Sequence, residues 1–427
     1  MPRMAAATRF VAAHVTDEDL VARGELPERC DPATLAALLL RQLPVAPPFD
    51  WAVFFFTAHF VPMAEQLANE LCEALGYPSL IGCSAESVIA TTRELEQRPA
   101  VALFAARTPH VRAQTFALQA HSAAEWSTIL SSGHAFREHV VGAKTPQLFI
   151  LLADPFTVPL SGRPPHYLGV LDAFNRFYAG VPAIGGVASG GTSPGSNTLV
   201  LNREVLRGGA VGLALEGDVQ VDLVVSQGCR PIGRPFRVTR TYQHFILELD
   251  NNPPLEQLET LIESLSRAEQ KRLAGSLLIG RLVQSEAHPP YAGFGRGDFV
   301  VRNVLGGDPN TGAIAVGDLL EVGDIVQFHL RDASTAQEDL EMLLAPHALL
   351  EPPQGVLLFA CNGRGTRLYP HADGDVRVIQ AALSGEDDAH PVPLAGFFCN
   401  GEIGPIRGQN FLHSYTAALA IFRSTRA

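Results

Sequence analysis

Short apolar runs alternate along the chain with polar segments and with stretches of helical length. The run at 355–360 (GVLLFA) is continuous and apolar, which predicts a strand buried on both faces. It ends in Cys361-Asn362-Gly363-Arg364-Gly365, whose glycines tolerate positive φ. A spacer of helical length leads to a second apolar run, which closes at the turn Asn400-Gly401 with Glu402 behind it. This layout predicts a strand–helix–strand unit whose strands end in polar turns.

The same layout occurs twice more in the first half of the chain. Residues 52–56 (AVFFF) precede a helical spacer and then YPSLIGCSAE at 77–86. Residues 148–153 (LFILLA) precede another spacer and then VPAIGGVASGG at 181–191. Either a threefold internal repeat or a generic strand–helix–strand protein would show this pattern. Both interpretations place Gly, Cys, Ser and Asn in the loops that follow strands.

A different pattern separates the second copy from the third. Residues 197–250 form short apolar runs divided by turn glycines, which predicts antiparallel hairpins. A helix rich in Glu and Leu begins at Leu255, directly after Asn-Asn-Pro-Pro, so we expect a domain boundary between 240 and 255. The fold class predicted is α/β with mixed α+β content. We expect two lobes of mixed β-sheets covered by helices, with a layered αββα arrangement as one form of it.

Three segments follow from these boundaries. We expect a helical extension over 1–47, a first domain over 48–240 and a second domain over 241–427. A length of 427 residues agrees with more than one domain.

Composition narrows the partners and the compartment. The net charge of −12 offers no basic field for nucleic acid or for an anionic membrane. No apolar run approaches the roughly 18 residues that a membrane span needs. The six cysteines show no C-x-x-C pair, and the N-terminus lacks a secretory pattern, so we expect reduced thiols, no disulfide and a cytoplasmic protein. We expect no metal, because His134 and His139 stand five apart without a cysteine pair nearby. We expect no other cofactor, because the glycine clusters at 185–191 and 293–297 form neither G-x-x-x-x-G-K-[ST] nor a G-x-G-x-x-G at the start of a helix.

Several longer motifs resemble one family. They are IGCSAES, SQGCRPIGRPFRVT, GDFVVRNVLGGDPNTGAIAVGD, VQFHLRDAS, CNGRG, GFFCNGEIGPI and NFLHSYTAALAIF. Together they resemble the FIST family (F-box and intracellular signal transduction), with a FIST N and a FIST C domain, over about 48 to 424. The resemblance implies an intracellular sensory module that binds a small ligand, such as an amino acid or another small carboxylate. The chain departs from the family's GCSTAGEI motif, because Ala85-Glu86 follows Gly82-Cys83-Ser84.

The resemblance also bears on how a signal would leave the protein. Residues 1–47 are too short for an output domain, so we expect a stand-alone member that signals through a separate protein.

A ligand site needs polar groups that converge where strands end. Arginine can bind a carboxylate bidentately, and a glutamate can accept an ammonium group. The candidates are Cys361, Asn362, Gly363, Arg364, Asn400, Gly401, Glu402, Arg331 and Arg302, with Asp332 beside them. The alternative is an internal network of arginines and carboxylates that holds the strand ends together.

An enzyme is the competing class of function. Cys361 or Cys399 could act as the nucleophile of a hydrolase or transferase, with His371 or His413 as the base. The sequence around neither cysteine matches a known nucleophile motif. We therefore predict no catalytic residue and favour a sensor.

Overall fold

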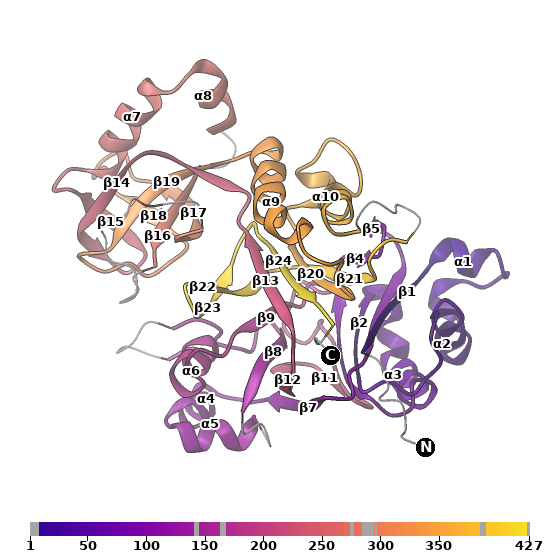
Figure 1. Ribbon diagram of the computed structural model, residues 1–427. Coiled ribbons are helices and arrows are strands. Elements are labelled where there is room, and N and C mark those ends of the chain that lie inside the picture. The colour runs from indigo at the N-terminus through magenta and orange to yellow at the C-terminus, as the bar shows by residue number, and fades with distance from the viewer. Residues whose placement is uncertain are drawn as a thin grey trace. The chain divides into compact units, whose positions relative to one another are not determined.

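Three pairs of parallel strands organise the larger part of the molecule. The computed structural model describes residues 8–140, 145–162, 168–273, 277–283, 294, 297–384 and 390–424 (Figure 1). The pairs are β2 (Trp51–Thr57) with β3 (Ser79–Ala85), β8 (Pro146–Ala153) with β9 (Ala183–Val187), and β20 (Gly355–Cys361) with β21 (Leu394–Cys399). A helix joins the strands of each pair, namely α3 (Ala64–Ala74), α6 (Val170–Phe177) and α10 (Gly374–Leu383). The three predicted strand–helix–strand units are therefore confirmed.

Each pair lies at the centre of a six-stranded sheet. The first sheet has the order β1-β6-β2-β3-β10-β11, adding β1 (Arg9–Thr16), β6 (Ala100–Arg107), β10 (Leu199–Leu201) and β11 (Glu204–Leu206). The second has the order β23-β22-β9-β8-β12-β7, adding β7 (Val111–Leu118), β12 (Ala210–Gly217), β22 (Glu402–Ile406) and β23 (Gln409–His413). The third has the order β13-β24-β20-β21-β4-β5, adding β4 (Val88–Ala90), β5 (Arg93–Leu95), β13 (Val221–Ser226) and β24 (Ala417–Phe422).

The hairpin that follows each pair leaves its own sheet and joins another. Hairpin β4–β5 follows β3 but pairs with β21. Hairpin β10–β11 comes after β9 along the chain but pairs with β3, and β22–β23 follows β21 but pairs with β9. The threefold repeat is thus interlocked, because no sheet is complete without a hairpin from another repeat.

A glycine occupies the same position in the second strand of each pair. A Cβ atom on Gly82, Gly185 or Gly396 would lie 2.7, 1.9 or 1.8 Å from the carbonyl oxygen of the paired strand. No side chain fits at those distances, so this close approach of strands requires glycine. The glycine that the sequence repeats after each proline marks this position.

The inner faces of all three sheets share one apolar core. It includes Val53, Phe55, Ile150, Phe359 and Phe397. The rings of Phe55 and Phe397 stack across two sheets with centroids 4.8 Å apart. Three sheets contribute to this core, rather than the two of a layered αββα arrangement.

Helices cover the outer faces of the first two sheets (Figure 1). The first sheet is covered by α2 (Pro32–Arg41) and α3, and the second by α4 (Ala123–Leu130), α5 (Gly133–His139) and α6. The remaining short helices are α1 (Asp17–Val21), η1 (Pro27–Arg29), η2 (Ala58–Met63) and η3 (Gly365–Arg367). The segment 1–47, expected to be helical, also contributes strand β1, which pairs with β6 along its whole length.

The chain divides into two compact units, and the sheets described so far belong to unit 1. Unit 1 comprises Met1–Val225, Glu341–Leu412 and Thr416–Ala427, and unit 2 comprises Ser226–Leu340 with His413–Tyr415. The chain thus enters unit 2 before the expected boundary at 240–255 and returns to unit 1 within helix α9 (Ala333–Ala348).

Unit 2 is a closed barrel with the strand order β14-β15-β18-β17-β16-β19. The strands are β14 (Cys229–Tyr242), β15 (Phe245–Leu249), β16 (Leu277–Leu282), β17 (Phe299–Gly307), β18 (Ile314–Val316) and β19 (Ile325–Arg331), and the helices are α7 (Pro254–Ser264) and α8 (Arg267–Leu273). All pairs of barrel strands are antiparallel, as the pattern in 197–250 predicted for its part. Mixed sheets with helices confirm the predicted fold class. No helix among the described residues is long and apolar enough to cross a membrane.

Candidate functional site

The two polar turns that the sequence singled out lie side by side in unit 1. Cys361 and Cys399 end adjacent parallel strands and are register partners. The backbone N–H of Asn362 donates to the carbonyl oxygen of Cys399 at 2.9 Å. The Asn362 side chain donates to Oδ1 of Asn400 at 2.8 Å. The carboxyl ends of neighbouring parallel strands therefore bring the two turns together, as their sequence predicted.

Glu402 and Gly401 lie behind these turns, in the interior. Glu402 opens β22 and faces Gly186 of β9, and its side chain is completely buried. Its Oε2 accepts a hydrogen bond from the backbone N–H of Thr416 at 3.0 Å. The Gly401 carbonyl accepts from the N–H of Val187 at 2.8 Å. Glu402 thus bonds the backbone of another segment from inside the protein.

Arg364 is buried in an ion pair. Its Nε and Nη2 each lie 2.6 Å from an oxygen of Asp375, and Nη2 also donates to Tyr369 at 2.9 Å. Burial opposes the charge of Arg364, but Asp375 outweighs it and raises the pKa of the guanidinium above its usual value. These contacts match the internal network that the sequence left as the alternative. Gly363, beside it, donates its N–H to Sγ of Cys361 at 3.4 Å.

A second carboxylate, which sequence reasoning missed, meets the same cluster. Glu94 on β5 accepts the N–H groups of Asp375 and Val376 at 2.8 and 3.1 Å, at the start of α10. Its other oxygen, Oε2, is buried without a hydrogen-bond partner among the described residues. Burial, followed by the charge of Asp375, raises the pKa of Glu94 to about 8. The tripeptide Arg-Glu-Leu in a short hairpin gives no sign of this burial.

The other two predicted arginines lie in unit 2. Arg302 places Nε 3.9 Å from Asp318, which also pairs with Arg281 at 3.1 Å. Arg331 stacks its guanidinium over the ring of Tyr415, 4.7 Å from the centroid. In the same unit, Asp332 caps α9 by accepting from the N–H of Thr335 at 2.8 Å. All three therefore make structural contacts within unit 2.

The cysteines and histidines that a hydrolase or transferase would use differ in their exposure to solvent. All six cysteines are in the thiol form, and Cys361 alone among them is only half-buried. Complete burial raises the pKa of the Cys399 thiol well above its usual value. His371 is exposed and points Nδ1 at the carbonyl of Ala372, 3.1 Å away, whereas His413 is buried. These features do not favour Cys399 as a nucleophile.

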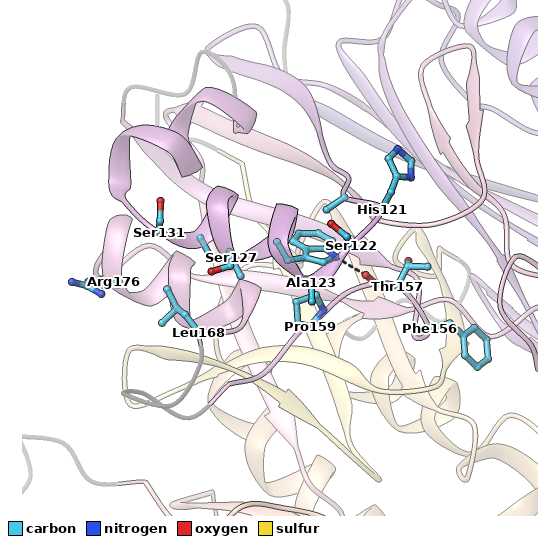
Figure 2. Close-up of a pocket in the computed structure, with 13 residues that line it drawn as sticks. His121, Ser122, Ala123, Ser127, Ser131, Phe156, Thr157, Pro159, Leu168 and Arg176 are labelled. Carbon is cyan, nitrogen blue, oxygen red and sulfur yellow. Dashed lines mark hydrogen bonds between the residues drawn. The ribbon is translucent and has the colours of Figure 1, made fainter.

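A large cavity in the described part of unit 1 lies elsewhere, beside α4 (Figure 2). Its volume is about 880 Å³. It is lined by α4 and its flanks, by the segment after β8, and by Leu168 with Arg176 of α6. The lining residues are Ala120, His121, Ser122, Ala123, Trp126, Ser127, Leu130, Ser131, Phe156, Thr157, Pro159, Leu168 and Arg176.

One wall of this cavity is fixed by a tryptophan. Trp126 is buried, and its Nε1 donates to the carbonyl of Thr157 at 2.8 Å, as the dashed line in Figure 2 shows. The hydroxyl of Thr157 donates to Asp154 and accepts from the N–H of Gly209, both at 2.8 Å. The polar groups of this wall are therefore already hydrogen-bonded to one another, and the wall offers mainly the ring surface of Trp126 to a ligand.

The polar groups around the cavity include a single arginine. Arg176 is exposed, and its guanidinium lies 5.5 Å from the ring centroid of Phe177. Within the described residues it makes no ion pair, so its charge is available to an anion. The hydroxyl of Ser127 is exposed, and none of the described lining residues is acidic. The cavity thus combines an apolar wall with one cation.

Comparison with known proteins gives this chain relatives along most of its length. The FIST N domain matches residues 50–252 and the FIST C domain matches residues 254–405. An uncharacterised protein of Mycobacterium tuberculosis strain H37Rv is 40% identical over 81% of this chain and 83% of its own. An uncharacterised protein of Mycobacterium bovis is 38% identical over 84% of this chain and 86% of its own length. Among solved structures, cyanuric acid hydrolase from A. caulinodans matches 49% of this chain and 71% of its own at 9% identity, with a TM-score of 0.24, too low to carry an argument.

The fold defines a class of mixed α/β proteins in which three interlocked strand–helix–strand repeats share one core and a β-barrel is inserted along the chain. The chain belongs to the FIST family, as its motifs indicated. FIST domains are associated with sensory signal transduction.

Proposed function

We propose that this protein is a sensor that binds a small organic anion and signals through a separate protein. The observation that carries the proposal is the cavity of Figure 2, with its apolar wall and an arginine that makes no ion pair within the described part of the chain. A volume of about 880 Å³ falls within the range of small-molecule sites, roughly 300–1,000 Å³. The family's association with sensory signalling supports a ligand that is bound rather than converted.

The lining residues indicate the chemistry of that ligand. Arg176 can hold a carboxylate through two parallel hydrogen bonds, and Trp126 and Leu130 can pack against an apolar group. An amino acid would also bring an ammonium group, for which no described lining residue supplies a carboxylate. A monocarboxylate with an aromatic or branched apolar body therefore fits this cavity better than a zwitterion does.

The strand-end turns at Asn362 and Asn400 are a second place where such a ligand could bind. They carry side-chain amides and, at Asn400, an exposed residue at the carboxyl edge of parallel strands. In this placement the family's expected small carboxylate would contact the turns Cys361–Gly363 and Asn400–Glu402. Variants separate the two placements.

A melting-temperature screen tests the proposal. The probes are phenylacetate and indole-3-acetate, each with its uncharged amide, and phenylalanine as the zwitterion. A ligand at about 100 times its Kd adds roughly 2.7 kcal/mol of stability, which the melting curve resolves. We expect the acids to raise the melting temperature more than the amides and phenylalanine do.

Two arginine variants locate the site. Arg176→Gln removes a charged hydrogen-bond partner worth about 1.5–3 kcal/mol, which weakens binding roughly 10- to 100-fold. Arg41→Gln is the matched control, because Arg41 is likewise an exposed arginine in the last turn of a helix. Equal ligand shifts in both variants would exclude Arg176. A shift that persists in Arg176→Gln but is lost in Asn362→Ala with Asn400→Ala would place the ligand at the strand ends instead. If none of the acids stabilises the wild type, the proposed ligand class is wrong.

A further inference from the structure

Two cysteines stand opposite each other at the edge of the third sheet. Cys361 is the last residue of β20 and Cys399 the last of β21, and the two are register partners in parallel strands. Neighbouring strands lie about 4.8 Å apart, and a disulfide needs Cα atoms about 4.4–6.8 Å apart. The backbone of this strand pair therefore already has the spacing that a disulfide requires.

Both side chains point to the same face of the sheet. Side chains alternate along a strand, and Leu357 and Phe359 of β20 pack in the central core. Cys361 continues this series, and Cys399 continues the series of Ala395 and Phe397 in the same core. Consistent with this placement, Cys399 interacts electrostatically with Cys361, although its interaction with Cys83 is the larger of the two.

The two thiols differ in their access to solvent. Cys361 is half-buried, whereas Cys399 is completely buried with Sγ 3.5 Å from the carbonyl of Phe397. A small oxidant can therefore reach Cys361 first, and Cys399 can then react only with a sulfur that is already beside it. This asymmetry is the one expected of an attacked and a resolving cysteine.

The charged groups around Cys361 are mixed. Arg364 and Arg367 both interact electrostatically with Cys361, and the N–H of Gly363 donates to its sulfur. Each arginine is itself paired, Arg364 with Asp375 and Arg367 with Glu86. Glu402 lies on the side of Cys399. Cys361 thus has two cations and an N–H donor near its sulfur, while the Glu402 carboxylate contributes to the raised pKa of the Cys399 thiol.

We propose that Cys361 and Cys399 are a peroxide-sensitive thiol pair that closes to a reversible disulfide. The thiolate of Cys361 attacks one oxygen of hydrogen peroxide, which breaks the O–O bond and releases hydroxide, leaving a sulfenic acid. The thiol of Cys399 then attacks that sulfur, and its proton leaves with the hydroxyl group as water. Overall, two thiols and one peroxide give one disulfide and two waters, and an added dithiol reverses the reaction.

The bond would lock the two turns to each other. Asn362 and Asn400, which follow the two cysteines directly, are joined in the reduced protein by one side-chain hydrogen bond. A covalent link one residue before each of them restricts the separation of the turns. The pair thus provides a site through which an oxidant acts on the strand ends, independently of the cavity beside α4.

Peptide mapping tests the pair directly, because trypsin separates the relevant cysteines. Cys361 falls in the peptide 332–364 and Cys399 in 378–407, whereas Cys72 and Cys83 share 42–93. Folded full-length protein is treated with hydrogen peroxide, alkylated, digested without reductant and analysed by mass spectrometry. We expect a linked 332–364/378–407 pair that dithiothreitol dissolves, in the wild type and in Cys83→Ser.

Variants and a sulfenic-acid probe complete the test. Cys399→Ser should leave Cys361 as a sulfenic acid that dimedone labels, and Cys361→Ser should abolish both the link and the label. Cys399→Ala replaces Cys399→Ser if the buried hydroxyl prevents folding, which a melting curve shows. The proposal is refuted if peroxide carries wild-type Cys361 to the sulfinic acid without a link. A link from 332–364 to 42–93, or dimedone labelling of the buried cysteines as fast as that of Cys361, refutes it as well.

Discussion

The replacement of Glu94 by glutamine should change how the stability of the protein depends on pH. Glu94 is buried at the start of α10, accepts two backbone N–H groups through Oε1, and has no described partner at Oε2. Burial and Asp375 raise its pKa from 4.5 to about 8. A glutamine keeps an oxygen for the two N–H groups and cannot ionise, so Glu94→Gln isolates the effect of the proton.

The sign and size follow from linkage. The folded state holds the Glu94 proton up to about pH 8, whereas the unfolded chain releases it near 4.5. Stability from this group is therefore complete below pH 4.5 and is lost as pH rises towards 8. A difference of about 3.5 pKa units, at about 1.36 kcal/mol each, amounts to roughly 5 kcal/mol as an upper figure. Between pH 5 and 8 the wild type should lose up to ~4 kcal/mol relative to Glu94→Gln.

Urea unfolding of both proteins at pH 5, 6, 7 and 8 measures this difference. The free energy of unfolding of Glu94→Gln, relative to that of the wild type, should increase with every step up in pH. Glu96→Gln is the control, since Glu96 is two residues away, only half-buried, and accepts from Thr366. If the free energies of wild type and Glu94→Gln run parallel from pH 5 to pH 8, Glu94 does not hold a proton in the folded state and the reasoning fails.

Three further predictions rest on single buried contacts. Arg364→Lys cannot reproduce the bidentate bond to Asp375, so the urea midpoint should fall by an amount equivalent to about 3–5 kcal/mol. An unchanged midpoint would contradict the role of Arg364 in a buried structural ion pair. Gly396→Ala should destabilise unit 1 severely because its Cβ would lie 1.8 Å from Leu358 O, whereas Gly317→Ala, with 3.8 Å to its nearest neighbour, should be nearly neutral by melting temperature. Burial lowers the pKa of His329 to about 4, so its imidazole should stay neutral at pH 5 in an NMR titration. The stability that this neutral ring contributes should be lost only as pH falls from 6.5 through about 4. An NMR midpoint near 6.5 would show that the ring is solvated.

The sequence was informative where a single segment determines the structure. The apolar runs ending in Gly, Asn and Cys predicted the parallel pairs, because a strand buried on both faces must be apolar throughout. It also predicted that the turns at Asn362 and Asn400 meet. For Arg364 it left two roles open, because a guanidinium can bind either an anionic ligand or a carboxylate of the protein. The structure shows that Asp375 pairs with Arg364.

Features that depend on distant segments could not be predicted in this way. The cavity beside α4 exists only because Trp126, the segment after β8 and Arg176 meet, and none of these carries a motif. Glu94 is buried by α10, which lies some 280 residues away along the chain, through a hairpin that has crossed to another sheet. Neither the apolar pattern nor the charge of Arg93-Glu94-Leu95 indicates that this hairpin joins another sheet.

The exchanged hairpins also explain why buried carboxylates occur in this core. Glu94 lies on hairpin β4–β5 and accepts two backbone N–H groups from the distant start of α10, and Glu402 on hairpin β22–β23 accepts the N–H of Thr416 before β24. Those N–H groups open α10 and precede β24, where no helix or sheet partner satisfies them, so a carboxylate there offsets a cost that an apolar side chain would leave. Glu94 thereby fixes its hairpin to the sheet that this hairpin completes, whereas Glu402 links hairpin β22–β23 of the second sheet to the segment before β24 of the third sheet. Because every sheet contains such a hairpin, one repeat cannot open without removing strands from another, and we expect unit 1 to unfold as one cooperative body.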